Sequence, residues 1–166
     1  MTEPQALSKA ELLEALRSSE REVVSKLSAL SPDDLERGRY ESGWNGREIL
    51  AHIASMEWTY PRLVDVAREA AAPKGAAATP TGGFRGGTGD YNQRQVEKRA
   101  GASVADLLAE FRQNRAATIA AVEQADEALL ATPIRSAGGI TGPLARVFYL
   151  LAVMHVAGHV NDIVMR

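Results

Sequence analysis

Apolar residues recur at intervals of three and four along several stretches of the chain, with charged and polar residues between them. This spacing gathers the apolar side chains on one face of a helix. The first such stretch runs from Ser8 to about Leu30, and Ser8 with Glu11 forms a capping box at its start. Its apolar stripe consists of Leu12, Leu16, Val23, Leu27 and Leu30. The pattern predicts an amphipathic first helix.

A second stretch begins at "GWNGREIL", where Asn45 is the expected N-cap and Glu48 its partner in a capping box. Pro61 lies inside this stretch and should kink or end the helix, because proline has no N–H to donate. The stripe of this helix consists of Ile49, His52, Ile53, Met56, Tyr60, Leu63 and Ala67. We therefore expect His52 to point inward with the core residues. Trp44 and Trp58 are interpreted mainly as packing residues, and Trp58, near His52, could instead border a pocket.

The segment from Ala70 to Gly89 separates the first two helices from the rest of the chain. Its sequence, "AAAPKGAAATPTGGFRGGTG", is too rich in Gly, Pro and Ala for a regular element. We expect a flexible loop over about residues 70–89, and an ordered lid carrying Phe84 and Arg85 is the alternative. The following "DYNQRQVEKRA" predicts a short polar helix.

Two more stretches complete the pattern. The third helix is expected to begin at the cap Ser103 and to bury Val104, Leu107, Leu108, Phe111, Thr118, Ile119 and Val122. Arg115 falls on or beside this stripe and is expected to reach solvent, with contact to an anionic substrate as the alternative. The fourth follows "GGITGPL", with Pro143 in its first turn, and its expected face is Leu144, Phe148, Leu151, His155, Gly158, His159 and Asp162. No alternating pattern indicates a strand. The fold class is therefore predicted as all-α, a four-helix bundle forming a single domain over residues 1–166.

Composition and charge narrow the function classes. The chain has 166 residues, with 19 basic and 21 acidic side chains and a formal charge of -2, and neither sign forms a long run, so nucleic acid is not an expected partner. Residues 147–160 form the longest uncharged apolar run, shorter than the roughly 18 residues of a membrane span. No signal-peptide pattern opens the sequence, so we expect a cytoplasmic protein without a membrane partner. The absence of cysteine excludes disulfides and a protein-borne thiol nucleophile.

The chain has only three histidines, His52, His155 and His159, and all three fall on predicted inward stripes. Imidazoles four residues apart on a helix can share one divalent ion, and His52 is the remaining imidazole for a third ligand. The residues between the pair are "VAG", without the glutamate of the zinc proteases. Hydrogen-bonded core histidines without an ion are the alternative, because a buried imidazole must satisfy two ring nitrogens. Asp162 either accepts a hydrogen bond from an imidazole N–H and so orients the ring, or is a solvated residue near the end of the helix.

Three segments together resemble the DinB-like superfamily of small metal-dependent enzymes: "GWNGREILAHIASME", "DYNQRQVEKRA" with Asn92, and "HVAGH" on the last helix. The resemblance implies an up-down-down-up bundle, a divalent metal held by His52, His155 and His159, and a homodimer. Relatives in this superfamily include the N-terminal domain of mycothiol-dependent maleylpyruvate isomerase and the bacillithiol and mycothiol S-transferases. The lack of cysteine fits such a role, because the thiol would arrive as a cosubstrate.

Three functions remain open at this point. The first is a metal-dependent enzyme that activates a low-molecular-weight thiol for transfer to a small-molecule electrophile, an S-transferase. The second is a hydrolase in which the same three-histidine site activates water, and the third is a non-catalytic, stress-related dimeric metal-binding protein. Imidazole ligands suit several ions, with Zn²⁺ the first expectation and Ni²⁺ or Fe²⁺ the alternatives.

Overall fold

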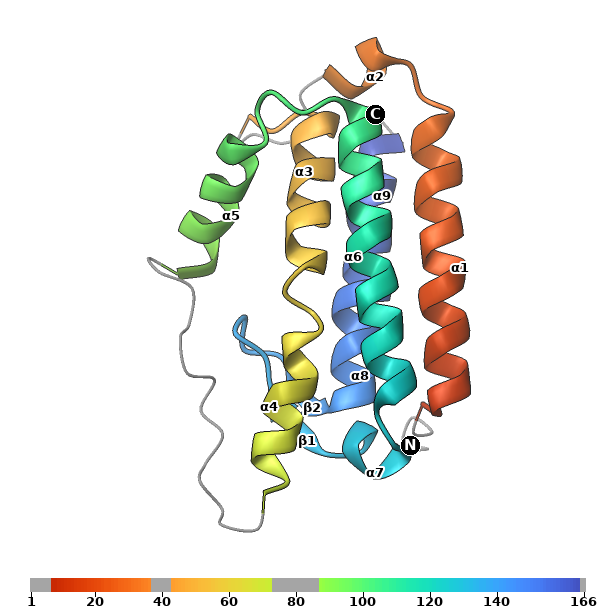
Figure 1. The fold of residues 1–166 in the computed structure, drawn as a ribbon. Helices are drawn as coiled ribbons and strands as arrows, with labels where there is room; N and C mark the ends of the chain where they lie inside the picture. Colours follow the sequence, from red (N-terminus) through yellow and green to blue (C-terminus); the bar gives the residue numbers. More distant parts are fainter. Residues whose placement is uncertain (1–6, 37–42, 73–86, 165–166) are drawn as a thin grey trace, which may run out of the picture.

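The structure is a computed structural model and describes residues 7–36, 43–72 and 87–164 (Figure 1). The described chain forms helices and one small antiparallel hairpin. In chain order the elements are α1 Lys9–Ser28, α2 Pro32–Glu36, α3 Gly46–Glu57, α4 Arg62–Ala70, α5 Gly87–Lys98, α6 Val104–Gln124, α7 Glu127–Leu130, β1 Pro133–Arg135, β2 Thr141–Pro143, α8 Leu144–Phe148, the π-helical segment η1 Tyr149–His155, and α9 Val156–Val164. The fold is thus mostly helical.

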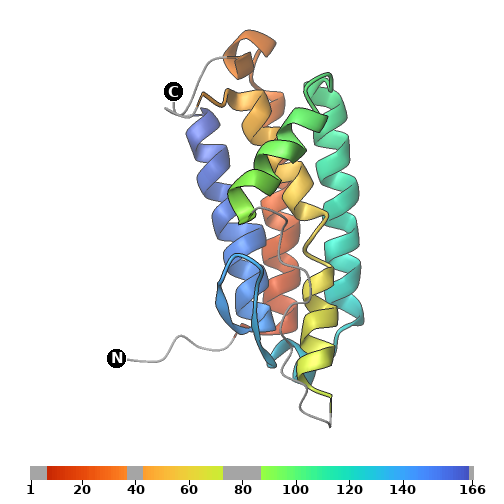
Figure 2. The ribbon, with the colours of Figure 1, turned by 90° about the vertical axis from the view of Figure 1, so that its left-hand side faces the viewer.

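Long helical segments lie side by side and enclose the core (Figure 1). They are α1, the interrupted helix α3 and α4, α6, and the continuous run of α8, η1 and α9, called the fourth helix below. In Figure 1, α1 and the fourth helix run in one direction, and α3, α4 and α6 run in the other. Figure 2 shows α5 crossing α3 near one end and the hairpin lying over α8 near the other.

The starts of three helices are as the sequence predicts. Ser8, Asn45 and Ser103 each accept a hydrogen bond from the backbone N–H three residues on, and the acidic residue there bonds back to the cap N–H. The prediction for Pro61 is also confirmed, because α3 ends at Glu57 and α4 begins at Arg62. These features depend on residues a few positions apart, so the sequence alone determines them.

The expectation that no strand is present was wrong. β1 and β2 pair antiparallel, with Ile134 opposite Gly142, and Gly139 takes a φ of 88° in the turn between them. Strands of three residues are too short to show an alternating pattern, although two glycines between apolar residues are typical of a hairpin. Pro143 ends β2 and caps α8, where the sequence had placed it inside the helix.

The last residues of the segment predicted as a loop, 70–89, are helical. Residues 87–89 already belong to α5, the short polar helix, which therefore begins before "DYN". Phe84 and Arg85, the expected candidates for a lid, lie outside the described residues, as does the rest of 73–86.

The fourth helix buries a different face from the one predicted. Its buried positions are Leu144, Ala145, Val147, Phe148, Ala152, Val156, Val160 and Ile163. The predicted face assumed an uninterrupted α-helix, whereas η1 is wound more widely, with i→i+5 hydrogen bonds. Since each residue advances an α-helix by about 100°, the wider turn changes which side chains face the core. His155 is consequently exposed and His159 half-buried, beside the core stripe rather than in it.

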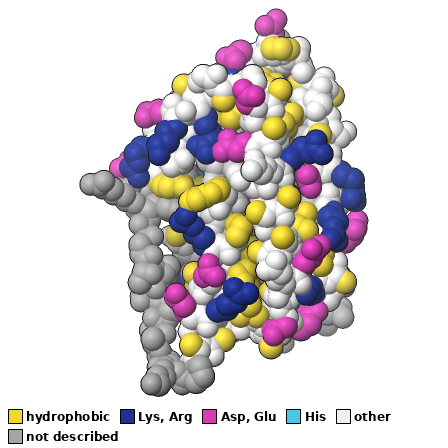
Figure 3. All heavy atoms as spheres, in the orientation of Figure 1, with side chains coloured by type: hydrophobic (Ala, Val, Ile, Leu, Met, Phe, Trp, Pro, Cys, Tyr) yellow, Lys and Arg dark blue, Asp and Glu magenta, His cyan; other side chains and the backbone are white. Residues whose placement is uncertain are grey.

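The fourth helix is also long and apolar enough to cross a membrane by length and composition alone. It spans 21 residues, with a mean hydropathy of 1.5 over its most apolar window, a third of which is buried. Core helices of soluble bundles meet the same criterion, and this helix packs against α1 and α3. On the face in Figure 3, basic and acidic side chains are interspersed without a field of one sign. The expected absence of a membrane or nucleic-acid partner remains a prediction.

Arg115 was expected to reach solvent, and this expectation was wrong. Its side chain is fully buried and forms an ion pair with Glu57, which is also fully buried. The guanidinium donates two bonds to this carboxylate, from Nε to Oε1 (2.5 Å) and from Nη2 to Oε2 (3.1 Å). Burial raises the pKa of Glu57, against the opposing effect of Arg115. Pairing inside the core overrides the tendency of arginine to snorkel, because here a carboxylate and carbonyl groups replace water.

Two glycines should respond oppositely to alanine. A Cβ at Gly46 would lie 3.2 Å from the Leu35 backbone and from Ile163, whereas one at Gly158 would meet no atom within 4 Å. We expect Gly46→Ala to lower the free energy of unfolding by about 1–3 kcal/mol through overpacking. Gly158→Ala should raise it by about 0.5–1 kcal/mol through helix propensity. Urea unfolding of both variants tests this, and a Gly46→Ala protein as stable as the wild type would contradict the close packing of α2, α3 and α9.

Candidate metal centre

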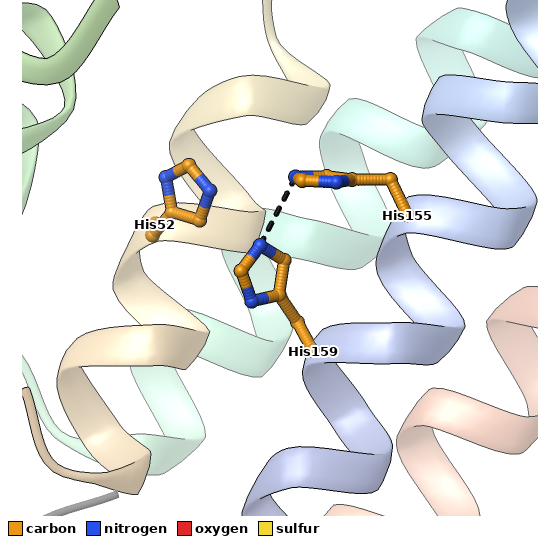
Figure 4. Close-up of side chains that lie close together, drawn as sticks. All are labelled: His52, His155 and His159. Atoms are coloured by element: carbon orange, nitrogen blue, oxygen red, sulfur yellow. Dashed lines mark hydrogen bonds between the residues drawn. The ribbon is translucent and has the colours of Figure 1, made fainter. Parts of the chain in front are cut away.

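The three histidines come together although they lie on two helices far apart in the sequence. His52 projects from α3, His155 is the last residue of η1, and His159 follows one turn later on α9 (Figure 4). The Nε2 atoms of His155 and His159 are 3.0 Å apart, and one ring nitrogen from each of the three residues lies within 4.8 Å of the others. The sequence-based prediction that these residues share one site agrees with this geometry.

The donor set fits a divalent ion. Nitrogens bound to one tetrahedral zinc at about 2.0–2.1 Å lie roughly 3.3 Å from one another, close to the separation of His155 and His159. The same separation also suits an N–H···N hydrogen bond between neutral rings, the arrangement expected without an ion. Three imidazoles supply three ligands, as in catalytic zinc sites, which keep a fourth position for water or substrate.

His52 provides a second test of the fit. One of its ring nitrogens faces the other two histidines in Figure 4, and the other points away from them. Its Nδ1 is buried without a hydrogen-bond partner among the described residues, and so is the Oδ1 of Asn92 on α5. A metal-bound imidazole needs an acceptor for its second N–H, and Asn92 offers a buried acceptor on the same cavity. The residues present therefore suit a histidine-bound ion.

The electrostatics of the site keep the imidazoles neutral. Burial, together with the proximity of His159 and His155, lowers the pKa of His52 to about 3. Burial and His155 lower the pKa of His159 to about 4, and burial lowers that of His155. Neutral imidazole is the form that binds a metal, so near pH 7 no proton has to leave before an ion binds.

Asp162 lies close enough to act on this site. Its negative charge raises the pKa of His159, against the larger effects of burial and His155. This agrees with the position of Asp162 one turn beyond His159 on α9. Its role as an acceptor that orients an imidazole remains a proposal.

The three histidines line one wall of a cavity of about 720 Å³. The cavity lies between α3 and α4, the fourth helix, the hairpin and α5, and this volume is within the range of small-molecule sites. Apolar groups from Met56, Leu63, Ile140 and Leu151 line it, and Arg62, Arg135, Asp65 and Glu69 add charges. Arg62 is held over the Trp58 ring at 4.0 Å, so the half-exposed Trp58 is a partner for this cation rather than core packing.

Sequence reasoning missed two contributors to the cavity. Arg135 and Ser136 of the hairpin were given no role, and Gly138 was placed in "GGITGPL", the stretch before the fourth helix, where only the glycines indicated a turn. Trp44 was interpreted mainly as packing, but its ring centroid lies 5.3 Å from that of His52 and its Nε1 donates to Gln93 on α5 at 3.1 Å. Trp44 thus contacts a candidate ligand directly.

Comparison with known proteins agrees with the fold and places the chain in a family. The sequence model of the mycothiol maleylpyruvate isomerase N-terminal domain matches residues 16–163. A crystal structure of the mycothiol-dependent maleylpyruvate isomerase superposes with a TM-score of 0.72 at 16% identity, covering 98% of this chain and 63% of that one. A histidine-to-alanine variant of such an isomerase gives a TM-score of 0.65 at 15% identity, covering 100% of this chain and 70% of that one. No curated protein sequence matches the chain.

The fold and the histidine cluster together define a helical domain of the DinB-like superfamily. Within that superfamily, the chain belongs to the family of the mycothiol maleylpyruvate isomerase N-terminal domain. It spans 63% of the length of the first isomerase structure, so the isomerase activity belongs to that longer protein.

The lowered histidine pKa values predict how stability depends on pH. Histidines in the unfolded chain take up protons below about pH 6.5. In the folded protein, the pKa of His52 is about 3 and that of His159 is about 4, so these two imidazoles take up protons only at much lower pH. The unfolded state then binds more protons, so the metal-free protein should lose stability as the pH falls from about 6.5 toward 4. Urea unfolding of wild type and a His52→Ala, His155→Ala, His159→Ala variant at about pH 7.5 and 4.5 measures this loss. An equal loss in both proteins would contradict the prediction.

Proposed function

We propose that this protein is a metal-dependent enzyme in which His52, His155 and His159 hold one divalent ion and a low-molecular-weight thiol reacts with a small electrophile. The observation that carries the proposal is the convergence of three neutral imidazoles on the wall of a cavity of about 720 Å³. A site used only for structure would need a fourth protein ligand. Among the described residues, these three histidines are the one group of candidate ligands close enough together to share an ion.

When bound, a divalent ion would lower the pKa of a thiol or water molecule beside it and so make it a better nucleophile near neutral pH. Side chains of the protein orient the ligands and shape the site. Trp44 packs on the ring of His52 and limits its orientation, and Asn92 presents an acceptor beside the same cavity. The apolar wall, including Met56 and Leu151, excludes water from part of the site.

Two observations, the composition of the chain and its family, support the hypothesis that a thiol is the nucleophile. The sequence contains no cysteine, so a sulfur nucleophile must come from solution. The family is named for a mycothiol-dependent isomerase domain, and the volume of the cavity suits an organic molecule. In a transfer reaction the thiol sulfur forms a bond to the electrophilic carbon, the leaving group departs with the bonding pair, and the thiol proton passes to solvent. Zn²⁺ is the first choice of ion for imidazole ligands, with Ni²⁺ or Fe²⁺ as alternatives.

The finer architecture is part of the same proposal. The directions of the long helices support an up-down-down-up four-helix bundle in a single domain (Figure 1). A homodimer is proposed with the superfamily, and Met154 and Val164, 53% and 40% exposed, supply apolar surface on the fourth helix for such an association. A cytoplasmic location remains a prediction.

Metal binding can be measured directly. Protein purified without a histidine tag and reconstituted with Zn²⁺ or Ni²⁺ should hold close to one ion per chain after gel filtration. The variant with all three histidines changed to alanine should hold none and still give a helical circular dichroism spectrum, because catalytic metal sites sit on folds that form without the ion. Elemental analysis measures the content. A wild type that stays metal-free after reconstitution would overturn the proposal and leave three core histidines.

Thiol dependence separates a transferase from a hydrolase. The loaded protein should accelerate the reaction of mycothiol or bacillithiol with a chromogenic aryl halide above the uncatalysed rate, and the triple alanine variant should not. Turnover of ester substrates without thiol would instead support the hydrolase, since water alone would then be the nucleophile. A fully loaded protein that accelerates neither reaction over a broad panel, and unfolds when the ion is chelated, would support the non-catalytic metal-binding protein.

A further inference from the structure

We propose that Arg115 and its partner Glu57 are positioning residues for the histidine site: they hold the π-helical turn η1 in place and so set where His155 and His159 lie relative to His52. This inference rests on the proposed function, because the residues that it positions are the proposed metal ligands. The observations behind it are the hydrogen bonds of the buried Arg115 guanidinium, and these do not depend on an ion.

Arg115 connects every long helical segment of the fold. From α6 it donates to Glu57, the last residue of α3, and its Nη1 donates to the carbonyl oxygen of Leu16 in α1 at 2.9 Å. Its Nη2 donates to the carbonyl oxygen of Ala152 in η1 at 2.6 Å. The same side chain therefore ties the helix of His52 to the helix of His155 and His159. Planar guanidinium geometry makes these bonds directional, so the guanidinium constrains the relative position of the two helices.

The bond to Ala152 falls where the helix departs from α geometry. In an α-helix the carbonyl of Ala152 would accept from the N–H of Val156, but this N–H donates to the carbonyl of Val153. The Ala152 carbonyl, without this α-helical donor, accepts from Arg115 and from the hydroxyl of Ser19 at 3.5 Å. A buried carbonyl without a partner is costly, so the guanidinium stabilises the π-turn over a regular α-turn.

A second side chain holds the neighbouring carbonyl. The hydroxyl of Tyr60, which is buried, donates to the carbonyl oxygen of Leu151 at 3.2 Å. Tyr60 lies in the break between α3 and α4, three residues after Glu57. The break in the second long helix and the π-turn in the fourth therefore face each other and are joined by two polar side chains.

The consequence for the site follows from helix geometry. His155 and His159 follow Ala152 by three and seven residues, so the turn at Ala152 sets the rotation of both imidazoles. If η1 returned to regular α-helical turns, the helix after it would rotate by roughly 100° for each extra residue that the π-turn now accommodates. The two imidazoles would then leave the wall that they share with His52.

The test replaces the ion pair without leaving a lone buried charge. An Arg115→Met, Glu57→Leu double variant substitutes apolar groups of similar length, a change that cores often accept without loss of stability. We expect it to fold, to exchange the amide hydrogens of residues 149–157 faster in the metal-free state, and to bind Co²⁺ about 10- to 100-fold more weakly, as for groups that orient ligands. The visible d–d bands of bound Co²⁺ should change in intensity, because they report the coordination geometry.

Two milder variants keep the test decisive if the double variant does not fold. Tyr60→Phe removes only the hydroxyl at Leu151 and should weaken Co²⁺ binding by about five-fold, the value of one hydrogen bond. Arg115→Lys keeps the charge but cannot reach all three acceptors, and should change the Co²⁺ bands as well. The matched control is Arg99→Met with Glu110→Leu, an Arg–Glu pair between the end of α5 and α6. It should leave the affinity and the bands unchanged.

The outcomes separate the two proposals. A wild type that binds no Co²⁺ overturns the proposed function, while the hydrogen exchange of the metal-free proteins still decides whether Arg115 holds the π-turn. Folded variants with the exchange rates, Co²⁺ affinity and bands of the wild type would overturn the positioning role. Equal effects in the control pair would overturn it too, by showing a general loss of stability.

Discussion

The buried ion pair between Arg115 and Glu57 aligns the long helices with one another. Arg115 and Glu57 are both fully buried, and a charge in an apolar core is tolerated only when it is paired and hydrogen-bonded. Each guanidinium nitrogen donates to the carboxylate or to one of two backbone carbonyls, and these acceptors belong to three different helices. The apolar stripes bring the helices together without fixing their exact alignment, because apolar contact has no direction. The directional bonds of the guanidinium do fix it.

The candidate metal centre is built on this alignment. His52 lies five residues before Glu57 on α3, and His155 lies three residues after Ala152 on the fourth helix. The imidazoles meet because Arg115 holds the end of α3 and the η1 segment of the fourth helix in a fixed relative position. Around them the site is dry enough to keep the rings neutral and open enough to face a cavity of about 720 Å³. That combination suits a reactive ion better than a structural one.

Much of the fold could be predicted from local sequence. The capping boxes at Ser8, Asn45 and Ser103 and the break at Pro61 all follow from residues within one turn of each other. The grouping of the three histidines was also predictable, because imidazoles are scarce in this chain and all fall in apolar segments. Arg115 was misjudged, because its sequence neighbourhood does not reveal a carboxylate 58 residues away.

The starts of the helices and the residues that could hold an ion are therefore set locally, since caps, prolines and histidine spacing act over a few residues. The buried face of the fourth helix depends instead on contacts between helices. A side chain from α6 takes the carbonyl of Ala152, the turn widens, and the phase of the helix shifts. The hairpin beside the cavity was decided in the same way, because strands of three residues persist only when they pair with each other and pack on α4 and α8.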